Sequence, residues 1–297
     1  MRDAFCKAMV RQAADPDLVF LTGDLGFRAL EPLRDALGRR FINAGVAEQN
    51  MVTVAAALAR SGLRPWVYSI APFVYARPFE QIRNDVCLHN LPVVMVGNGG
   101  GYGYGVMGCT HHSVEDYGAV LCLPNIQAWV PAFDEDVGVM TERLMHGAHP
   151  TYLRLGLSEQ PKDMVLPEYD PWRRLVAGAG ATVLVVGPLV GGMVETARGL
   201  EEGRRPTIWL LSQLPPPPFP PQFLEDLRHS GHLMVVEEHV RHGGAGEMIA
   251  HRLLLEGRAP GRFTHRAATP GSTGRYGSQK FHRKECGLDP ASVLEAS

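Results

Sequence analysis

Residues 91–96 read LPVVMV, and residues 97–108, directly after them, read GNGGGYGYGVMG. A strand that is apolar at every position is typical of a parallel sheet with helices on both faces, whereas a half-exposed strand alternates. The run ATVLVV at residues 181–186 repeats this pattern in the second half of the chain. Helical segments separate these strands from further apolar ones, so we expect an α/β fold built on mainly parallel sheets.

The alternation of strands and helices is interrupted by a segment rich in proline and charge. We therefore predict two consecutive domains, residues 1–160 and 177–297, joined by a linker at residues 161–176. Each domain is expected to contain a mainly parallel sheet flanked by helices. Within the first domain, the segment from Val74 to Leu88 is predicted to be one helix.

The composition excludes several classes of function. With 29 Lys and Arg against 31 Asp and Glu, the net charge is −2, so nothing electrostatic favours binding to nucleic acid or an anionic membrane. No apolar run approaches the roughly 20 residues that span a bilayer, and no signal peptide is expected at the start. The five cysteines are scattered without a CxxC pair, which favours reduced thiols, a cytoplasmic location and no zinc site.

One carboxylate is placed at the start of a predicted helix. Glu48 lies in the sequence GVAEQN (residues 45–50), between a short strand at residues 41–44 and an apolar helix at residues 51–59. Backbone N–H groups at the start of a helix are unpaired and attract an anion. Glu48 is therefore either a simple helix cap or a functional acid held on a rigid element.

An aromatic segment, YSIAPFVYAR, occupies residues 68–77, where a strand is predicted to give way to a helix. Phe73, and next to it Tyr75, offer a face on which a flat ring can stack, which contributes about 0.5–1.5 kcal/mol beyond burial. A lone aromatic at such a junction is also compatible with an ordinary place in the hydrophobic core.

The glycine-rich segment follows a buried strand, at the edge of the sheet where open α/β folds bind ligands. Its glycines allow the backbone to approach a ligand closely. It matches neither a P-loop nor a dinucleotide-binding fingerprint. His111 and His112 come directly after it. Because adjacent side chains point in different directions, we expect one active-site histidine and one structural histidine rather than a metal-binding pair.

Together these features resemble the transketolase family, over the whole chain but over only the C-terminal half of a full-length member. Glu48 matches the family's Ala-Glu-Gln-type glutamate, residues 68–77 match its aromatic segment, and residues 107–112 match its histidine-containing loop. In the second domain, EEH at residues 237–239 and GGAG at residues 243–246 resemble a segment of 1-deoxyxylulose-5-phosphate synthases.

The resemblance implies a thiamine-diphosphate enzyme that transfers a two-carbon ketol unit from a ketose to an aldehyde. Glu48 would hydrogen-bond the far ring nitrogen of the aminopyrimidine and favour the imino form, in which the cofactor's own amino group is the base. Phe73 is expected to stack on the pyrimidine, with Tyr75 and Arg77 also at the cofactor. His111 is expected to bind substrate oxygens or move a proton.

The resemblance also implies that a second polypeptide completes the enzyme. The family holds the cofactor's diphosphate, through Mg²⁺ or Ca²⁺, with a Gly-Asp-Gly motif in its N-terminal domain, and this sequence contains no Gly-Asp-Gly. We therefore expect an N-terminal subunit that supplies the motif, a metal held mainly by that subunit, and an α2β2 assembly with a large apolar interface.

Departures from the family bear on the substrate. Met107 stands where the family has a substrate-binding aspartate, Asn98 near a phosphate-binding histidine, and Leu157 near a phosphate-binding arginine. Because phosphate sites rely on Arg and Lys, these changes favour a modified or nucleotide-linked sugar over an ordinary sugar phosphate. The alternative is that Arg2 and Arg154 bind a phosphate at this end of the pocket.

Other functions share parts of this pattern. The β subunit of a 2-oxo acid dehydrogenase has the same split architecture but decarboxylates its substrate, and so does a deoxyxylulose-phosphate-synthase-like enzyme. A non-catalytic regulatory subunit is the remaining alternative. Residues 110–112 and 237–239 favour a transketolase over the dehydrogenase, and the presence of Glu48 argues against a subunit without a catalytic role.

Overall fold

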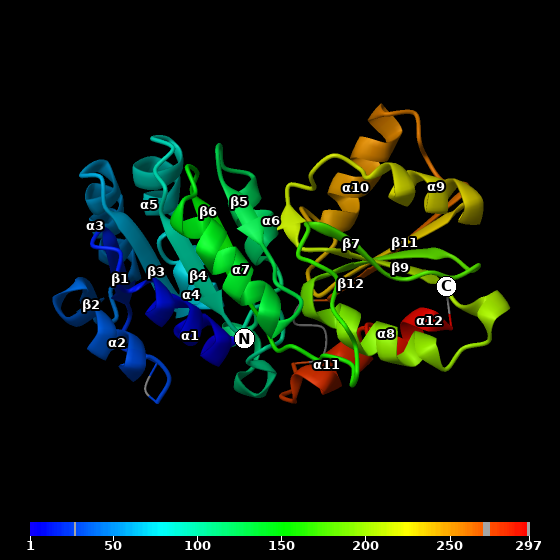
Figure 1. Cartoon of the computed structure of the whole chain (residues 1–297), viewed down its shortest axis with the longest axis horizontal. Helices are drawn as coiled ribbons and strands as arrows, with labels where there is room; N and C mark the ends of the chain where they lie inside the picture. Colours follow the sequence, from blue (N-terminus) through cyan, green and yellow to red (C-terminus); the bar gives the residue numbers. More distant parts are fainter. Residues whose placement is uncertain (27, 270–273, 296–297) are drawn as a thin grey trace.

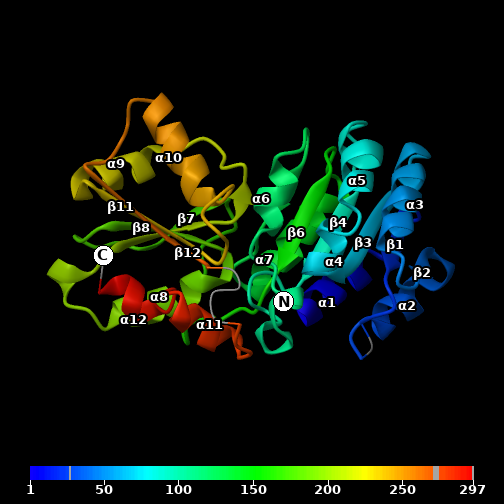
Figure 2. The same cartoon turned by 180° about the vertical axis from the view of Figure 1, so that it is seen from behind.

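The computed structural model describes residues 1–26, 28–269 and 274–295. Within these ranges the chain forms two lobes that lie side by side, one around a seven-stranded sheet and the other around a five-stranded sheet (Figures 1 and 2). Both sheets are mainly parallel and are flanked by helices. The predicted α/β fold class is therefore confirmed.

The first sheet has the strand order β10-β5-β6-β4-β3-β1-β2, and only β10 among its described strands runs antiparallel to its neighbour. Its strands are β1 (Leu18–Thr22), β2 (Phe41–Asn43), β3 (Arg64–Ile70), β4 (Val94–Asn98), β5 (Gln127–Trp129), β6 (Thr151–Leu155) and β10 (Gln213–Leu214). One face carries α1 (Arg2–Gln12), α2 (Glu31–Leu37) and α7 (Asp134–Met145). The other carries α3 (Glu48–Arg60), α4 (Ala71–Tyr75), α5 (Phe79–Gln81) and α6 (Asp116–Leu121).

The segment that we predicted as one helix from Val74 to Leu88 is divided. It contains the end of α4, the single turn α5, and a π-helix from Ile82 to Cys87. Pro78 lies between α4 and α5. Because proline lacks an N–H group and its ring clashes with the preceding turn, a continuous α-helix cannot pass through this position. Helical spacing over the segment did not reveal the break.

The second sheet has the order β12-β11-β8-β9-β7. Its strands are β7 (Trp172–Val176), β8 (Thr182–Val186), β9 (Thr207–Leu211), β11 (His232–Glu237) and β12 (Arg262–Ala267). Figures 1 and 2 show α9 (Pro221–Ser230) and α10 (Ala245–Leu255) on one face, with α8 (Val190–Arg198), α11 (Gln279–Glu285) and α12 (Pro290–Leu294) on the other.

Strand β7 corrects part of the predicted linker at residues 161–176. The strand pairs antiparallel with β9 at the edge of the second sheet, so that sheet already begins at Trp172. The proline and charge content of the segment suggested a linker. In the structure Arg173 is buried and forms a 2.6 Å ion pair with Asp136 of α7, which connects the two lobes.

The parallel register places the carboxyl ends of the central strands of the first sheet at one level. Ile70 at the end of β3 is paired with Asn98 at the end of β4, which is paired with Leu155 at the end of β6. Loops that leave these strands therefore meet at one edge of the sheet, which is where α/β folds place their sites. None of the helices in the described ranges combines the length and the apolar character needed to cross a membrane.

Candidate functional site at the carboxyl edge of the first sheet

Glu48 is the first residue of α3, and its side chain is only 4% exposed. Its carboxylate accepts hydrogen bonds from Arg77 Nη1, at 3.1 Å and 3.0 Å to its two oxygens, and from the Ser69 hydroxyl at 3.4 Å. Ala47, not Glu48, is the N-cap residue of the helix. A helix-capping role does not describe these contacts, which direct the carboxylate toward groups that follow β3.

Arg77 connects Glu48 with the aromatic ring of Phe73. The guanidinium carbon of Arg77 lies 3.9 Å from the centre of the Phe73 ring. Their spacing of four residues brings side chains together along a helical backbone. Phe73 is half-buried, and its ring meets the ring of His111 edge-on with centroids 5.3 Å apart. The structure thus brings together four residues that the sequence singled out in three separate segments.

Tyr75 does not belong to this group. It is 8% exposed and lies within the hydrophobic core, where its ring meets Tyr152 edge-on at 6.5 Å. Burial raises the pKa of Tyr75 above that of a free phenol. Two residues apart on a helical turn, Phe73 and Tyr75 point to different sides, so the structure does not place Tyr75 beside Phe73, and contact of Tyr75 with a cofactor stays a prediction.

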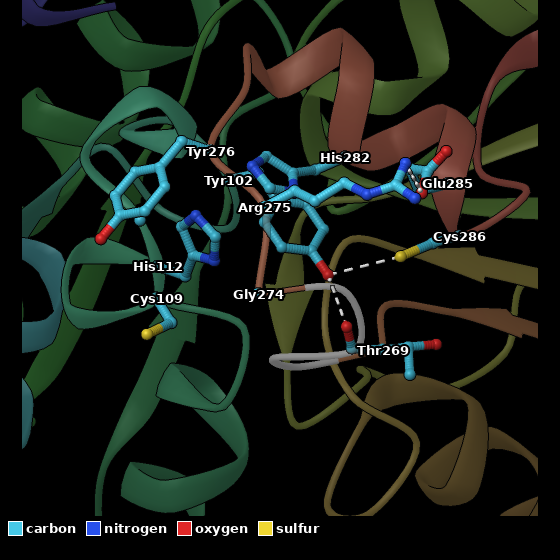
Figure 3. Close-up of a pocket in the computed structure, with 11 residues that line it drawn as sticks. Tyr102, Cys109, His112, Thr269, Gly274, Arg275, Tyr276, His282, Glu285 and Cys286 are labelled. Carbon is cyan, nitrogen blue, oxygen red and sulfur yellow. Dashed lines mark hydrogen bonds and ion pairs between the residues drawn. The ribbon is translucent and has the colours of Figure 1, made fainter.

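The two adjacent histidines face different neighbours, as the sequence predicted. His111 Nδ1 lies 3.0 Å from the Thr110 hydroxyl, and the ring faces Phe73. His112 instead contacts Tyr102 edge-on at 5.0 Å and His282 of α11 at 4.6 Å. Figure 3 shows His282 over the Tyr102 ring and His112 beside it. Burial lowers the pKa of His112, which keeps this ring neutral among its aromatic neighbours.

Tyr104 is a member of the site that the sequence analysis did not identify. Its hydroxyl accepts a 2.6 Å hydrogen bond from Asn98 Nδ2, and its ring lies 6.5 Å from the ring of His111. An aromatic side chain inside a glycine-rich segment was a signal that could have been followed. Tyr104 connects His111 with the pocket that contains Asn98.

That pocket lies beside the site and contains some, but not all, of the residues predicted to bind substrate. It is lined by Arg2, Asn98, Tyr104 and Leu157, among others. Arg2 is partly exposed there, with its Nε 3.7 Å from Asp3. Arg154 is instead 4% exposed and forms a 2.7 Å ion pair with Asp116, so it does not line this pocket, and its contact with a phosphate stays a prediction.

Several glycines of the loop after β4 lie against side chains of the same chain. A Cβ at Gly101 would lie 2.6 Å from the Glu238 carboxylate, and one at Gly100 would lie 2.5 Å from the Arg154 side chain. A Cβ at Gly99 would meet the Tyr104 ring. These close approaches are to side chains of the same chain, so packing within the chain requires glycine at these three positions. Met107, farther along the loop, is 53% exposed.

The group around Glu48 suits an aminopyrimidine ring. A buried carboxylate can accept or share a hydrogen bond with a ring nitrogen, and the half-buried Phe73 ring offers an aromatic contact. A diphosphate bound through a metal ion needs side chains that coordinate the metal. Among the residues that the structure describes, no group of three or more His, Cys, Asp or Glu side chains is placed to hold a metal ion.

Comparison with known proteins connects this site to a family. Residues 1–161 match the family model described as "Transketolase, pyrimidine binding domain". The chain is 29% identical to a subunit of the apulose-4-phosphate transketolase of Actinobacillus succinogenes, over 94% of this chain and 91% of that protein. It is also 29% identical to the 1-deoxy-D-xylulose-5-phosphate synthase of Myxococcus xanthus, over 96% of this chain but only 48% of that protein.

A solved structure agrees with these sequence matches. The structure titled "Split gene transketolase, inactive beta4 tetramer" superposes with a TM-score of 0.83 at 28% identity, over 99% of this chain and 95% of that one. The transketolase of Campylobacter jejuni shares the fold, with a TM-score of 0.77 at 18% identity, but this chain covers only 46% of it. The chain therefore corresponds in extent to the separately encoded subunits and to about half of the single-chain enzymes.

Proposed function

Because the chain belongs to the family with a transketolase pyrimidine-binding domain, we propose that it is the C-terminal subunit of a split transketolase. The observation that carries the proposal is the contiguous group of Glu48, Arg77, Phe73 and His111 at the carboxyl edge of the first sheet. The near-complete coverage of relatives that are themselves transketolase subunits or split-gene products supports the split. The reaction is the transfer of a two-carbon ketol unit from a ketose to an aldehyde.

The residues of this chain would hold the pyrimidine half of thiamine diphosphate. When bound, the cofactor supplies a nucleophilic carbon and an electron sink for the two-carbon unit. Glu48 would hydrogen-bond the pyrimidine nitrogen from its buried position, and Phe73 would make the aromatic contact. Arg77 shares the Glu48 carboxylate and lies on Phe73, so it orients both groups at the edge of the cofactor site.

His111 is the group of this chain that we assign to the substrate. Thr110 contacts Nδ1 of the ring, and within the described residues no hydrogen bond is recorded for Nε2, which leaves that atom for a substrate oxygen. An imidazole in hydrogen-bond range of a hydroxyl or carbonyl can orient it or move its proton. Tyr104, with Asn98 behind it, forms the wall between His111 and the neighbouring pocket.

A partner subunit would supply what these residues lack. We propose that an N-terminal transketolase subunit with a Gly-Asp-Gly motif binds the diphosphate through Mg²⁺ or Ca²⁺, and that the two chains form an α2β2 assembly. The cofactor then lies across the interface between the chains. This arrangement accounts for a cofactor site with a pyrimidine-binding face and no recognisable diphosphate-binding motif in the sequence.

The pocket beyond Tyr104 favours a modified or non-standard sugar as substrate. Its lining residues include a single guanidinium, Arg2, and the position near Leu157 is apolar. Phosphate recognition usually draws on Arg or Lys groups, so Arg2 is the residue on which any phosphate contact would depend. Two relatives are named for apulose 4-phosphate, so a phosphorylated sugar is the alternative to be tested. The test compares acceptors with and without a phosphate, with wild-type enzyme and with Arg2→Gln.

In that test, activity on unphosphorylated acceptors that Arg2→Gln leaves unchanged supports the modified sugar. Activity that requires the phosphate and falls in Arg2→Gln overturns it in favour of a sugar phosphate bound by Arg2. Met107 is exposed on the loop that follows β4, and together with His111 we place it at the substrate.

A decarboxylating enzyme similar to deoxyxylulose-phosphate synthases is the second candidate, because several relatives carry that name. An activity assay of the two-subunit enzyme separates ketol transfer from decarboxylation. The chain is co-expressed with a candidate N-terminal partner and supplied with thiamine diphosphate, Mg²⁺ and a panel of ketoses, 2-oxo acids and aldehydes. A new ketose without release of CO₂ supports ketol transfer, whereas CO₂ release coupled to product formation identifies the alternative.

A further inference from the structure

We propose that Glu238 of the second lobe is a positioning residue that holds the loop carrying His111 in its working conformation. The loop, here called the histidine loop, comprises residues 101–113. This inference rests on the proposed function, because it concerns the residue that we assign to the substrate. It gives the second lobe, which lies outside the matched pyrimidine-binding domain, a direct part in the site.

The base of the histidine loop is closed by backbone hydrogen bonds and fastened to Glu238. Gly101 and Ser113 exchange hydrogen bonds of 2.9 Å and 2.8 Å between their N–H and carbonyl groups. The next residue, Tyr102, donates its backbone N–H to Glu238 Oε1 at 2.6 Å. Arg154 Nη2 donates both to the Ser113 carbonyl at 2.8 Å and to the Glu238 carbonyl at 2.9 Å. The Tyr102 end of the loop is thus bonded directly to the Glu238 carboxylate, and the Ser113 end is connected through Arg154 to the Glu238 backbone carbonyl.

The Glu238 side chain is itself fixed from behind by α11. It is 4% exposed, and Gln279 Nε2 donates to its two oxygens at 2.9 Å and 3.2 Å. Arg283 Nε donates to Oε2 at 2.7 Å. Every group that faces the carboxylate in these contacts is a donor. A carboxylate is the side chain with acceptors only, which explains why an acid and not an amide stands at this position.

The histidine loop also rests on the segment that leads into α11. A Cβ at Gly105 would lie 2.7 Å from the Gly277 carbonyl oxygen, and a Cβ at Gly108 would meet the Tyr276 ring. His112 and His282 each place Nε2 3.3 Å from the Gly105 carbonyl. The loop is therefore supported at its base by Glu238 and along its length by the C-terminal segment. Both supports lie on the second lobe, while Phe73 meets His111 from the first.

Glu238→Gln removes one acceptor and adds a donor without changing the shape of the side chain. The new glutamine amide can take two orientations. In one, its NH₂ group faces the Tyr102 N–H while its oxygen faces Arg283 and Gln279. In the other, its NH₂ group faces Arg283. Either way two donors meet, and the base of the loop loosens. Arg283 keeps a second anion, because its Nη1 lies 3.6 Å from Glu159. The variant is therefore expected to fold.

The matched control is Arg173→Met. Arg173 forms a buried ion pair between the lobes, with Asp136 at 2.6 Å, but that pair does not contact the histidine loop. Removing it leaves the buried Asp136 carboxylate with the Ala132 and Phe133 N–H donors, at a cost of up to about 3–5 kcal/mol, and perturbs the contact between the lobes without altering the support of Glu238. Any effect that arises from general loosening of the lobes appears in both variants, whereas an effect of loop positioning appears only in Glu238→Gln.

The test measures backbone hydrogen exchange of this chain and kinetics of the reconstituted two-subunit enzyme. We expect Glu238→Gln to exchange faster at residues 101–113 than wild type and Arg173→Met to exchange there at the wild-type rate. In the reconstituted enzyme, Glu238→Gln is expected to lower kcat roughly 100-fold, as a small misplacement of a catalytic group does, with unchanged affinity for thiamine diphosphate. The affinity is unchanged because Glu48, Phe73 and Arg77 lie on other elements.

Wild-type exchange at residues 101–113 in Glu238→Gln, or the same increase in Arg173→Met, overturns the proposal. If Glu238→Gln does not fold, Gln279→Leu carries the same test, because it removes a donor that fixes the carboxylate and leaves the Arg283 pair in place. A wild-type mixture without ketol transfer defeats the proposed function, while the exchange measurement on this chain still decides whether Glu238 holds the loop.

Discussion

Replacement of Glu48 by glutamine separates a catalytic role of this carboxylate from a structural one. The substitution keeps the volume of the side chain and removes its charge. Its only ion-pair partner among the described residues is Arg77, whose side chain is 44% exposed. Water can therefore solvate the guanidinium once the carboxylate is gone, and no buried cation is left unpaired.

The expected cost to folding follows from that exposure. Breaking a fully buried pair costs about 3–5 kcal/mol because one charge is stranded, whereas a pair with a solvated partner contributes about 0–1 kcal/mol. The Ser69 hydroxyl bond, at 3.4 Å, is long and adds little. We therefore expect the free energy of unfolding of Glu48→Gln to lie within about 1 kcal/mol of wild type.

The expected cost to catalysis is larger. A carboxylate that controls the protonation state of the cofactor contributes of the order of 10²–10⁴ in rate, which corresponds to about 2.7–5.5 kcal/mol of activation free energy. The assay pairs urea unfolding of this chain with steady-state kinetics of the two-subunit enzyme. A variant that retains more than a tenth of the wild-type kcat, or one destabilised by about 3 kcal/mol or more, would refute the assignment.

Three further substitutions test neighbouring parts of the account. Phe73→Leu should weaken thiamine-diphosphate binding to the two-subunit enzyme roughly two- to tenfold in calorimetry, from the loss of about 0.5–1.5 kcal/mol of aromatic contact; wild-type affinity would place Phe73 in the core only. His111→Gln should lower kcat about 100-fold or more with unchanged cofactor affinity, and a normal kcat would exclude proton transfer or substrate binding by this ring. His239 accepts a hydrogen bond from the Gly118 N–H at Nε2 and contacts the Val240 carbonyl through Nδ1, and burial lowers its pKa below 6.5. Since the unfolded chain then binds the proton more readily, stability falls as the pH drops below about 6.5, and urea unfolding should show a smaller drop from pH 7.5 to 5.5 in His239→Gln than in wild type; equal drops would contradict this.

The α/β architecture was predictable because its signal is local and repeated. Strands buried on both faces leave nearly unbroken apolar runs, and β1 and β8 are examples that are buried along their whole length. The places where this pattern is interrupted, at β7 and at Pro78, were harder to predict. A charged strand such as β7 resembles a linker until the burial of Arg173 against Asp136 is known, and the effect of Pro78 depends on how the surrounding turns pack.

The site was predictable where residue type and spacing restrict the choice, and not where the direction of a side chain decides. Glu48, Phe73, Arg77 and His111 come from short motifs and lie together. Arg154 looked equally available for a phosphate, but a basic residue near the end of a strand can face a neighbouring loop instead. It is buried against Asp116, a partner 38 residues away in sequence.

The long-range contacts around Glu238 could not be predicted from the sequence, for the same reason. Its hydrogen bond with the Tyr102 N–H joins residues 136 positions apart, and nothing local in either segment indicates the other. The glycines of the loop were attributed to a ligand because close approach to a ligand and close approach to another part of the chain require the same backbone. Only the fold distinguishes the two.

We propose a cofactor site that is shared between this chain and an N-terminal partner. The most direct measurement is calorimetric titration of thiamine diphosphate with Mg²⁺ into this chain, into the candidate partner and into their mixture. We expect binding by the mixture and none by this chain alone, with the affinity lowered in a mixture that contains Phe73→Leu. Tight binding by this chain alone would contradict the account, since it would mean that the diphosphate is held without the partner.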